Sequence, residues 1–365
     1  MAGSSLGTIF KITTWGESHG KAIGVVVDGC PAGLSLCESD IQVYLNRRKP
    51  GQTGISTPRK EDDLVEILSG VFEGKTTGSP ISLLVRNTSQ HSNDYAEIAS
   101  YYRPSHADYT FDAKYGFRDY RGGGRSSGRE TIGRVAAGAI ALCLLKTLGI
   151  EVCAYTRSIG QIEVDMTRFD ASAILATPTA MPDYTASAQA EAYLAECKNK
   201  SDSAGGVIEC VVTHMPAGIG DPVFEKLDAN LAKAILSIGA VKAFEIGDGM
   251  QAATATGSTN NDAFVMQDKQ ITKRTNHAGG VLGGISDGSS ITLRAYVKPT
   301  PSIAAPQNTV TQSGENIQVS ITGRHDPVIV PRAVVVVEAM TALTIVDALM
   351  LNMSSTLSNL QTIYR

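Results

Sequence analysis

The run from Tyr120 to Glu130 combines residue types that bind anions. Three arginines and four glycines lie within these eleven residues, directly before a long apolar helical pattern. Glycine lets the backbone approach a ligand closely because it has no Cβ. Ser127 and Glu130 have the spacing of a capping box, which marks the start of a helix. Free N–H groups at a helix N-terminus, together with arginine side chains, predict a phosphate- or carboxylate-binding site.

Four of the six histidines lie in glycine-rich or turn segments: His19, His106, His277 and His325. Histidine is the side chain best matched to proton transfer near neutral pH. His19 is flanked by Gly16 and Gly20, and His106 lies in a Pro-Ser/Ala-Asp loop, so we interpret both as candidate acid–base groups. In the segment 323–327 a cation, an imidazole and a carboxylate are consecutive. Since adjacent side chains diverge in an extended segment, only two of the three can face one ligand.

Two familiar catalytic motifs are excluded. The segment 16–20 has the form Gly-x-Ser-x-Gly, but the residues after it are strand-like, whereas a nucleophile elbow needs a helix there. The glycine-rich segment 121–128 lacks the Gly-Lys-Ser/Thr ending of a Walker A loop, which disfavours a kinase or ATPase. A second run, 277–288, carries five glycines in twelve residues and fits a set of tight turns as well as it fits ligand contact.

Composition restricts the class of partner. The chain has 365 residues, is 42% hydrophobic and 19% charged, and carries a net charge of −4. This acidic balance and an aromatic content of 6% disfavour nucleic acid as a ligand. The six cysteines show no Cys-x-x-Cys spacing, so no metal site is expected. The most apolar stretch, 333–351, is interrupted by Glu338 and Asp347, and no basic-then-apolar leader opens the chain. We therefore expect no membrane span and a reducing cytoplasm.

Hydrophobic periodicity predicts alternating strands and helices. Strands are expected at 23–28, 81–85, 207–213, 291–297 and 317–321. Helices are expected at 39–49, capped by Ser39 or Asp40, at 128–148, at 221–235 with Asp221 as N-cap, and within 332–353. Because residues 334–337 are β-branched, the first part of the segment 332–353 could instead form a strand. The loop 51–58 has the composition of a lid.

Several strand pairs lie too close in sequence for helical crossovers. This spacing predicts an α+β fold with antiparallel sheets, and without a linker or a composition break we expect a single domain over residues 1–365.

Three segments resemble the signature regions of the chorismate synthase family: Thr14 to Gly20, Tyr120 to Ala141 and Gly323 to Pro327. Shorter matches run from residue 6 to about residue 350, at 46–51, 68–74, 103–109, 244–249, 276–286 and 298–300. The resemblance implies the last step of the shikimate pathway, in which 5-enolpyruvylshikimate-3-phosphate loses phosphate by anti-1,4 elimination to give chorismate. It also implies a requirement for reduced FMN, a β-α-β sandwich with helices between antiparallel sheets, and a homotetramer.

The resemblance also assigns residues. Those expected at FMN are Arg125, Ser126, Ser127, Gly239, Ala240, Gly283, Lys298, Pro299, Thr300, Pro301, Ser302 and Arg324. Those expected at the substrate are Ser18, Arg48, Arg103 and Arg129. By the same resemblance His19 protonates the departing phosphate, His106 protonates or holds the reduced flavin, and Asp326 helps relay the C6 proton. A substrate with a phosphate and two carboxylates fits a chain that gathers arginines locally on an acidic background.

Two positions depart from the family pattern. Gly54 stands where a second arginine is common, and either Arg59 replaces it or the site has one cation fewer. Gly239 stands where asparagine is usual, which removes a side-chain amide from the flavin pocket. Two other functions stay open: a bifunctional enzyme in which Arg48 and its loop serve NADPH, and a non-catalytic polyanion-binding module, which the net charge disfavours.

Overall fold

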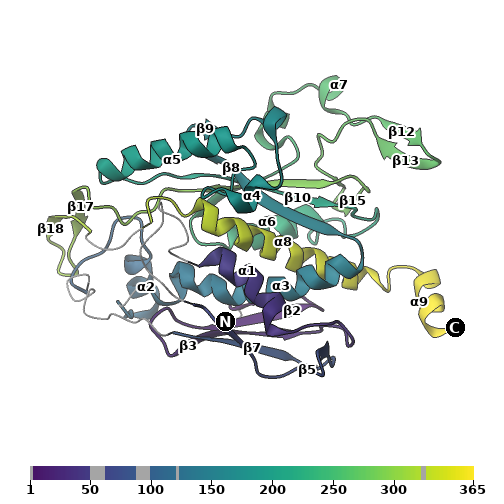
Figure 1. The fold of residues 1–365 in the computed structure, drawn as a ribbon, viewed down its shortest axis with the longest axis horizontal. Coiled ribbons are helices and arrows are strands. Elements are labelled where there is room, and N and C mark those ends of the chain that lie inside the picture. Colours follow the sequence, from purple (N-terminus) through teal and green to yellow (C-terminus); the bar gives the residue numbers. More distant parts are fainter. Residues whose placement is uncertain (1–2, 50–61, 88–98, 121–122, 322–325) are drawn as a thin grey trace.

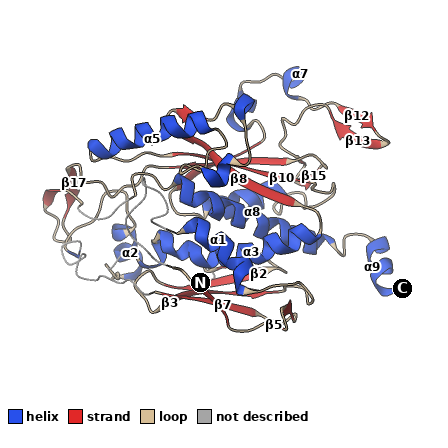
Figure 2. Cartoon of the chain, in the orientation of Figure 1, coloured by secondary structure: helices blue, strands red, loops and turns tan. Residues whose placement is uncertain are grey.

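Two five-stranded antiparallel sheets enclose a layer of helices (Figures 1 and 2). The computed structural model describes residues 3–49, 62–87, 99–120, 123–321 and 326–365. The first sheet contains β1 (Ser5–Leu6), β2 (Lys11–Gly16), β3 (Ala22–Asp28), β7 (Ile81–Arg86) and β4 (Val65–Ile67), in that spatial order. The second contains β11 (Val241–Ile246), β16 (Ile291–Val297), β10 (Gly206–Thr213), β8 (Glu151–Ile159) and β9 (Ile162–Glu163).

The enclosed helices form two levels. In Figure 1, α1 (Glu38–Arg48) and α3 (Thr131–Thr147) lie toward the first sheet, and α8 (Val330–Asn352) lies toward the second, as does α6 (Leu227–Leu236). Helix α5 (Tyr184–Asn199) covers the outer side of the second sheet near β9.

Smaller elements surround the sandwich. The short helices are α2 (Asp108–Tyr115), α4 (Ala173–Ala176), α7 (Gly257–Asn260) and α9 (Leu357–Tyr364). The two-stranded hairpins are β5–β6 (Val71–Phe72, Lys75–Thr76), β12–β13 (Phe264–Gln267, Gln270–Lys273), β14–β15 (Val281–Leu282, Ile285–Ser286) and β17–β18 (Gln307–Val310, Asn316–Val319). In Figure 1, α9 and the β12–β13 hairpin project from the same end of the molecule.

Alternating burial along the strands explains the sheets. In β7, Ile81, Leu83 and Val85 are buried and the residues between them are not. In β16 the same alternation runs from Ile291 to Val297. One apolar face per strand is the pattern of an antiparallel sheet packed on one side. The predicted α+β fold with helices between antiparallel sheets is confirmed.

Small residues let α3 and α8 approach closely. A Cβ placed on Gly138 would lie 2.3 Å from the Cβ of Ala339 in α8, and one on Gly133 would lie 3.1 Å from the carbonyl oxygen of Gly24 in β3. The slim surface predicted for α3 from its glycines and alanines is therefore used in packing, against a helix on one side and a sheet on the other.

We expect Gly138→Ala to destabilise the protein by about 1–3 kcal/mol, because the added methyl overpacks the α3–α8 contact. Urea unfolding measures the loss. Gly257→Ala is the control, because a Cβ at Gly257 meets no heavy atom within 4 Å. Equal stability of the two variants would show that α3 and α8 separate without cost.

The last long helix settles the open choice at 334–337. Residues 330–352 are helical throughout, and most of α8 is buried. By length and hydropathy alone α8 could cross a membrane, but 72% of its most apolar window is buried inside the protein. Within it, Glu338 pairs with Arg47 of α1 at 2.8 Å. Burial against both helices and strands here outweighs the β-branched preference for strand.

Two helix starts were predicted wrongly. Helix α6 begins at Leu227 and not at Asp221, because the N–H of Leu227 donates to the carbonyl oxygen of Gly284 and Val223 has a φ of 65°, outside helical geometry. Helix α1 begins at Glu38 after Cys37, and Asp40 accepts the N–H of Cys37 at 2.9 Å instead of capping the helix itself. The predicted lid at 51–58 lies outside the described residues.

Candidate active site

A tight turn after β2 holds Ser18 and His19. The side-chain amide of Asn87 donates to the carbonyl oxygens of Glu17 at 3.1 Å and Gly20 at 2.8 Å, which fixes both ends of the turn. Ser18 is buried, and its hydroxyl lies 3.2 Å from Nδ1 of the half-buried His19. The turn thus presents an oriented imidazole at the end of a strand.

The same Asn87 connects this turn to the predicted substrate arginines. Its Oδ1 accepts from Nε of Arg129 at 2.8 Å. Arg129 in turn pairs with Oδ1 of Asp63 at 3.1 Å, and Arg48 pairs with Oδ2 of Asp63 at 2.5 Å. The turn that carries His19 is therefore joined to Arg129 and Arg48 through Asn87 and Asp63, two residues that the sequence analysis missed. Asp63 belongs to a run of acidic residues, a pattern typical of a solvent-exposed surface, so nothing in the sequence indicated its role.

Arg48 lies in an unusually dry environment for a cation. Its side chain is 2% exposed, and burial lowers its pKa against the opposing effect of Asp63. Its Nε is buried and has no hydrogen-bond partner among the described residues. A buried donor without an acceptor costs free energy, which an anionic ligand at this point would recover.

We expect Arg48→Ala to destabilise the protein by about 3–5 kcal/mol, since it leaves the carboxylate of Asp63 buried with one partner fewer. Denaturant unfolding measures the change. The matched control is Arg86→Ala, whose ion pair with Glu66 is 69% and 43% exposed. Removing an exposed pair costs about 0–1 kcal/mol. A loss as small as the control's would contradict the buried pairing.

Arg332 joins Asp326 to this network. Its Nε donates to the carbonyl oxygen of Arg48 at 3.1 Å, and its NH1 bonds Oδ2 of the buried Asp326. On the other side, the carbonyl oxygen of Pro327 accepts the N–H of Ala204 at 2.8 Å. Asp326 thus lies between the arginines of the first half of the chain and the loops of the second half.

His106 belongs to a second group of predicted residues. Its Nε2 lies 2.7 Å from the hydroxyl of Ser302. Nζ of Lys298 donates to the carbonyl oxygen of Ser105 at 2.8 Å, and the N–H of Lys298 donates to Ala240 at 2.9 Å. Burial, and next the charge of Lys242, lowers the pKa of Lys298. Four residues assigned by resemblance to the flavin therefore do lie together: His106, Ala240, Lys298 and Ser302.

The segment 299–302 is held by its backbone. Ser203 donates to the carbonyl oxygen of Thr300 at 2.7 Å, and Gln307 donates to that of Pro301 at 3.4 Å. The hydroxyl of Thr300 is buried and has no partner among the described residues. A Cβ at Gly239 would meet no heavy atom within 4 Å. Glycine leaves that space open.

Arg103 is fixed by the start of α2. Its Nε and NH2 bond the two oxygens of Asp108, both at 2.8 Å, and its N–H also donates to Asp108. Although burial of Asp108 acts in the opposite direction, these hydrogen bonds lower its pKa. This bidentate pairing holds the Arg103 guanidinium in one orientation.

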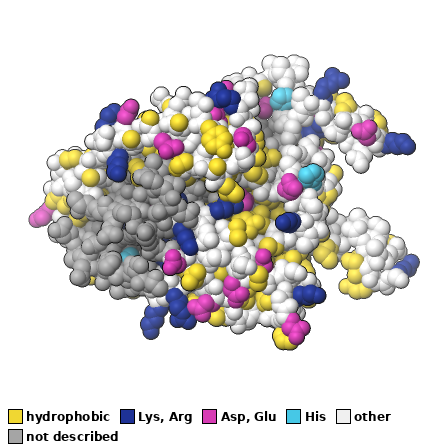
Figure 3. Space-filling view, in the orientation of Figure 1, with side chains coloured by type: hydrophobic (Ala, Val, Ile, Leu, Met, Phe, Trp, Pro, Cys, Tyr) yellow, Lys and Arg dark blue, Asp and Glu magenta, His cyan; other side chains and the backbone are white. Residues whose placement is uncertain are grey.

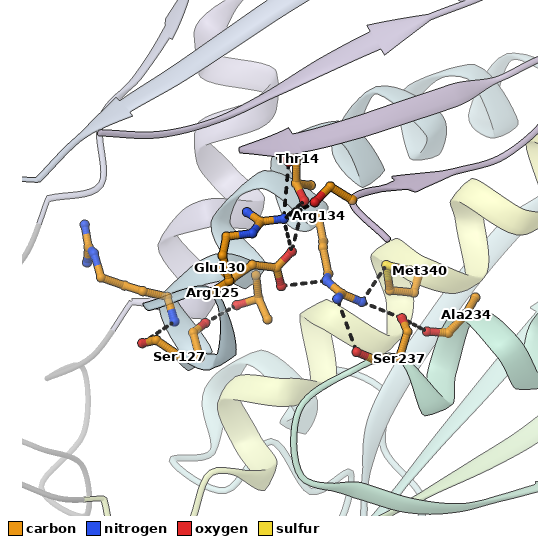
Figure 4. A network of polar contacts seen from close by, with 12 residues as sticks. Thr14, Arg125, Ser127, Glu130, Arg134, Ala234, Ser237 and Met340 are labelled. Atoms are coloured by element: carbon orange, nitrogen blue, oxygen red, sulfur yellow. Dashed lines mark hydrogen bonds and ion pairs between the residues drawn. The ribbon is translucent and has the colours of Figure 1, made fainter. Parts of the chain in front are cut away.

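Arg125 points away from its own loop. Figure 4 shows its guanidinium against Thr14, whose hydroxyl accepts at 2.7 Å, and a further bond reaches the carbonyl oxygen of Gly16 at 3.2 Å. Arg125, one of the three arginines of the predicted anion-binding run 120–130, thus binds the end of β2. Ser126 bonds the carbonyl oxygen of Gly123, and Arg121 lies outside the described residues.

The predicted capping box is only half formed. Ser127 accepts the N–H of Arg129 at 3.3 Å, at a short 3₁₀ turn that precedes α3. Glu130 instead accepts from Arg134 at 2.8 Å and from Thr14 at 3.2 Å, because these partners compete for its carboxylate (Figure 4). Arg134 continues to the hydroxyl of Ser237 at 2.6 Å, close to Gly239.

Gly283 is not brought near Lys298. It lies in the β14–β15 turn, and since the carbonyl oxygen of Gly279 accepts the N–H of Thr292, this hairpin begins at the Ile291 end of β16, whereas Lys298 follows the Val297 end. Seven residues of strand separate the two ends by roughly 20 Å, at about 3.3 Å per residue. Arg324 lies outside the described residues.

The described residues thus form an α+β sandwich whose loops carry two clusters of predicted site residues, one with Arg48, Arg129 and Asp326 and one with His106 and Lys298. A family model described as chorismate synthase matches residues 10–350. Curated chorismate synthases of Agathobacter rectalis and Lachnospira eligens are each 66% identical over 365 residues, with both chains fully covered. A crystal structure of chorismate synthase matches with a TM-score of 0.76 at 31% identity, covering 98% of this chain and 96% of the other.

The chain belongs to the chorismate synthase family. This match confirms the resemblance inferred from the motifs. Members of the family are carbon–oxygen lyases of aromatic amino-acid biosynthesis.

Proposed function

We propose that this protein converts 5-enolpyruvylshikimate-3-phosphate to chorismate and phosphate by anti-1,4 elimination, with reduced FMN bound. The observation that carries the proposal is the network in which Asn87 and Asp63 join His19, Arg129 and Arg48. It joins the turn that carries a titratable group to two cations, which fits the departure of a phosphate group.

The residues present fit a flavin phosphate and ring system. Lys298 supplies a cation, and Gly239 leaves open space beside Ala240. The buried hydroxyl of Thr300 has no hydrogen-bond partner in the part of the chain that the structure describes. These residues, with Ser302 and His106, would hold reduced FMN. When bound, reduced FMN supplies electron density to the breaking C–O bond and recovers it afterwards.

The remaining steps fall to side chains of this chain. Arg48, Arg129 and Arg103 bind the phosphate and carboxylates of the substrate. His19 donates a proton to the departing phosphate, and Asp326 accepts the proton that leaves C6. His106, hydrogen-bonded to Ser302, holds its imidazole at the flavin. The adjacent hydroxyl of Ser18 orients the His19 ring.

We further propose that the protein acts as a cytoplasmic homotetramer. Exposed apolar side chains support self-association. They lie on α9, where Leu357 is 71% exposed, in the β12–β13 hairpin and at Phe224. Figure 3 shows hydrophobic atoms on the projecting α9. Light scattering coupled to gel filtration measures the mass, and a monomer at micromolar concentration would contradict the assembly.

Anaerobic phosphate release from the enolpyruvyl substrate tests the proposed reaction. We expect release with prereduced FMN and without NADPH, and no release when reduced FMN is left out. Turnover from oxidised FMN plus NADPH would indicate the bifunctional form. Release that is independent of flavin would contradict the proposal.

A further inference from the structure

We propose that Asp63 is a positioning residue, which holds Arg48 and Arg129 as a preorganised site for one oxyanion of the substrate. The inference rests on the proposed function, and it assigns a role to a residue that no motif pointed to. The oxyanion is a carboxylate or phosphate group, because these are the anions whose geometry matches a guanidinium group.

One carboxylate holds both arginines. Oδ2 of Asp63 lies 2.5 Å from NH2 of Arg48, and Oδ1 lies 3.1 Å from NH2 of Arg129. The side chain of Asp63 is 0% exposed, that of Arg48 is 2% exposed and that of Arg129 is 11% exposed. Oδ2 is hydrogen-bonded to Arg48, whereas Oδ1 lies at ion-pair distance from Arg129 and has no hydrogen-bond partner among the described residues. The charge of this one carboxylate therefore attracts both guanidinium groups. Because the carboxylate of Asp63 is buried, water has little access to replace it as the partner of the two arginines.

The backbone around Asp63 is itself fixed. Its φ is 44°, in the left-handed region that non-glycine residues rarely adopt. Gln42 of α1 donates to the carbonyl oxygen of Asp63 at 3.3 Å and accepts the N–H of Val65 at 3.1 Å. Arg48 belongs to the same helix as Gln42. Strained backbone that its surroundings hold in place is a feature of functional sites.

Three arginines lie around two carboxylates here. Arg48 and Arg129 pair with Asp63, and Arg332 pairs with Asp326. The buried Nε of Arg48 has no hydrogen-bond partner among the described residues. One anionic group of a ligand would supply the missing acceptor.

The test is Asp63→Asn, assayed with wild type for phosphate release under saturating reduced FMN. Asparagine keeps the shape, but its amide N–H repels one arginine. We expect KM to rise by roughly 10- to 100-fold, the factor for one charge-assisted hydrogen bond, while kcat changes far less. The affinity for oxidised FMN should stay at the wild-type value. A merely structural aspartate would not separate KM from kcat in this way.

Asp183→Asn is the matched control. Asp183 is also a buried carboxylate paired with an arginine, Arg168 at 2.8 Å, but it caps α5 on the outer layer. Since asparagine also caps helices, we expect wild-type KM. If Asp63→Asn does not fold, Asp63→Glu keeps the charge and moves the carboxylate by one methylene, and a raised KM is again expected.

A double-mutant cycle completes the test. In the Asp63→Asn background, Arg129→Ala should raise KM less than it does in the wild type, because Arg129 is already misplaced. Additive effects, or unchanged KM in Asp63→Asn or in its Glu substitute, would overturn the inference. If the wild type itself releases no phosphate, the proposed function fails instead, and calorimetric titration with the substrate still reports whether Asp63 supports binding.

Discussion

Replacing His19 with alanine is expected to lower turnover by roughly 100-fold or more, the contribution of a positioned acid–base group. The fold should remain, because Asn87 holds the turn through the backbone of Glu17 and Gly20 rather than through the imidazole. The measurement is kcat for phosphate release under saturating reduced FMN, together with the melting temperature.

His214→Asn serves as the control for His19. His214 is exposed and has a φ of 59°, a conformation that asparagine adopts readily. We expect its turnover to equal that of the wild type. Comparable turnover in His19→Ala would rule out the proton-donor role, and a large drop in its melting temperature would make the loss structural.

The second large effect is expected for Asp326→Asn. Asparagine keeps the size and an oxygen for Arg332 but loses the base, so single-turnover rates should fall by roughly 10²- to 10⁴-fold. Binding of oxidised FMN and of substrate should stay normal. Rapid-mixing kinetics with prereduced FMN measures the rate of the chemical step.

The partner of Asp326 supplies the comparison. Arg332→Lys keeps a cation beside Asp326 but loses the bond from Nε to the carbonyl oxygen of Arg48. We expect a smaller loss of rate in this variant than in Asp326→Asn. A wild-type single-turnover rate in Asp326→Asn would reduce Asp326 to a structural partner of Arg332.

Local patterns predicted the sheets well because burial repeats with period two. The strand at 291–297 has the bounds that its alternation indicates, and those at 23–28 and 81–85 differ by one residue. Helix starts were harder to predict, since distant contacts decide them. The bond from Leu227 to Gly284 shortens α6, and no pattern near residue 221 reveals it.

The candidate site shows the same division. Motifs pointed to His19, Arg48 and Arg129, because their neighbours are glycines and arginines in family-specific order. Asp63 and Asn87, which join them, are ordinary polar residues whose importance comes only from pairing across the fold. Gly283 matched a motif equally well, yet the fold places it at the far end of β16. A motif specifies a residue's local conformation and not its distance from other motifs.

The contact between Gly138 and Ala339 also acts as a spacer. His19 follows β2, Arg48 ends α1 and Arg129 precedes α3, on the side of the first sheet. Lys298 and Ser302 follow β16 of the second sheet, and Asp326 precedes α8. The distance between the two halves is set where α3 meets α8, at a point with no room for one methyl group. A bulkier residue there is expected to push the halves apart and to widen the gap between His19 and Asp326, the proposed proton donor and acceptor. Under the proposed mechanism, the small residues in the middle of the core thus set the catalytic alignment without contacting a ligand.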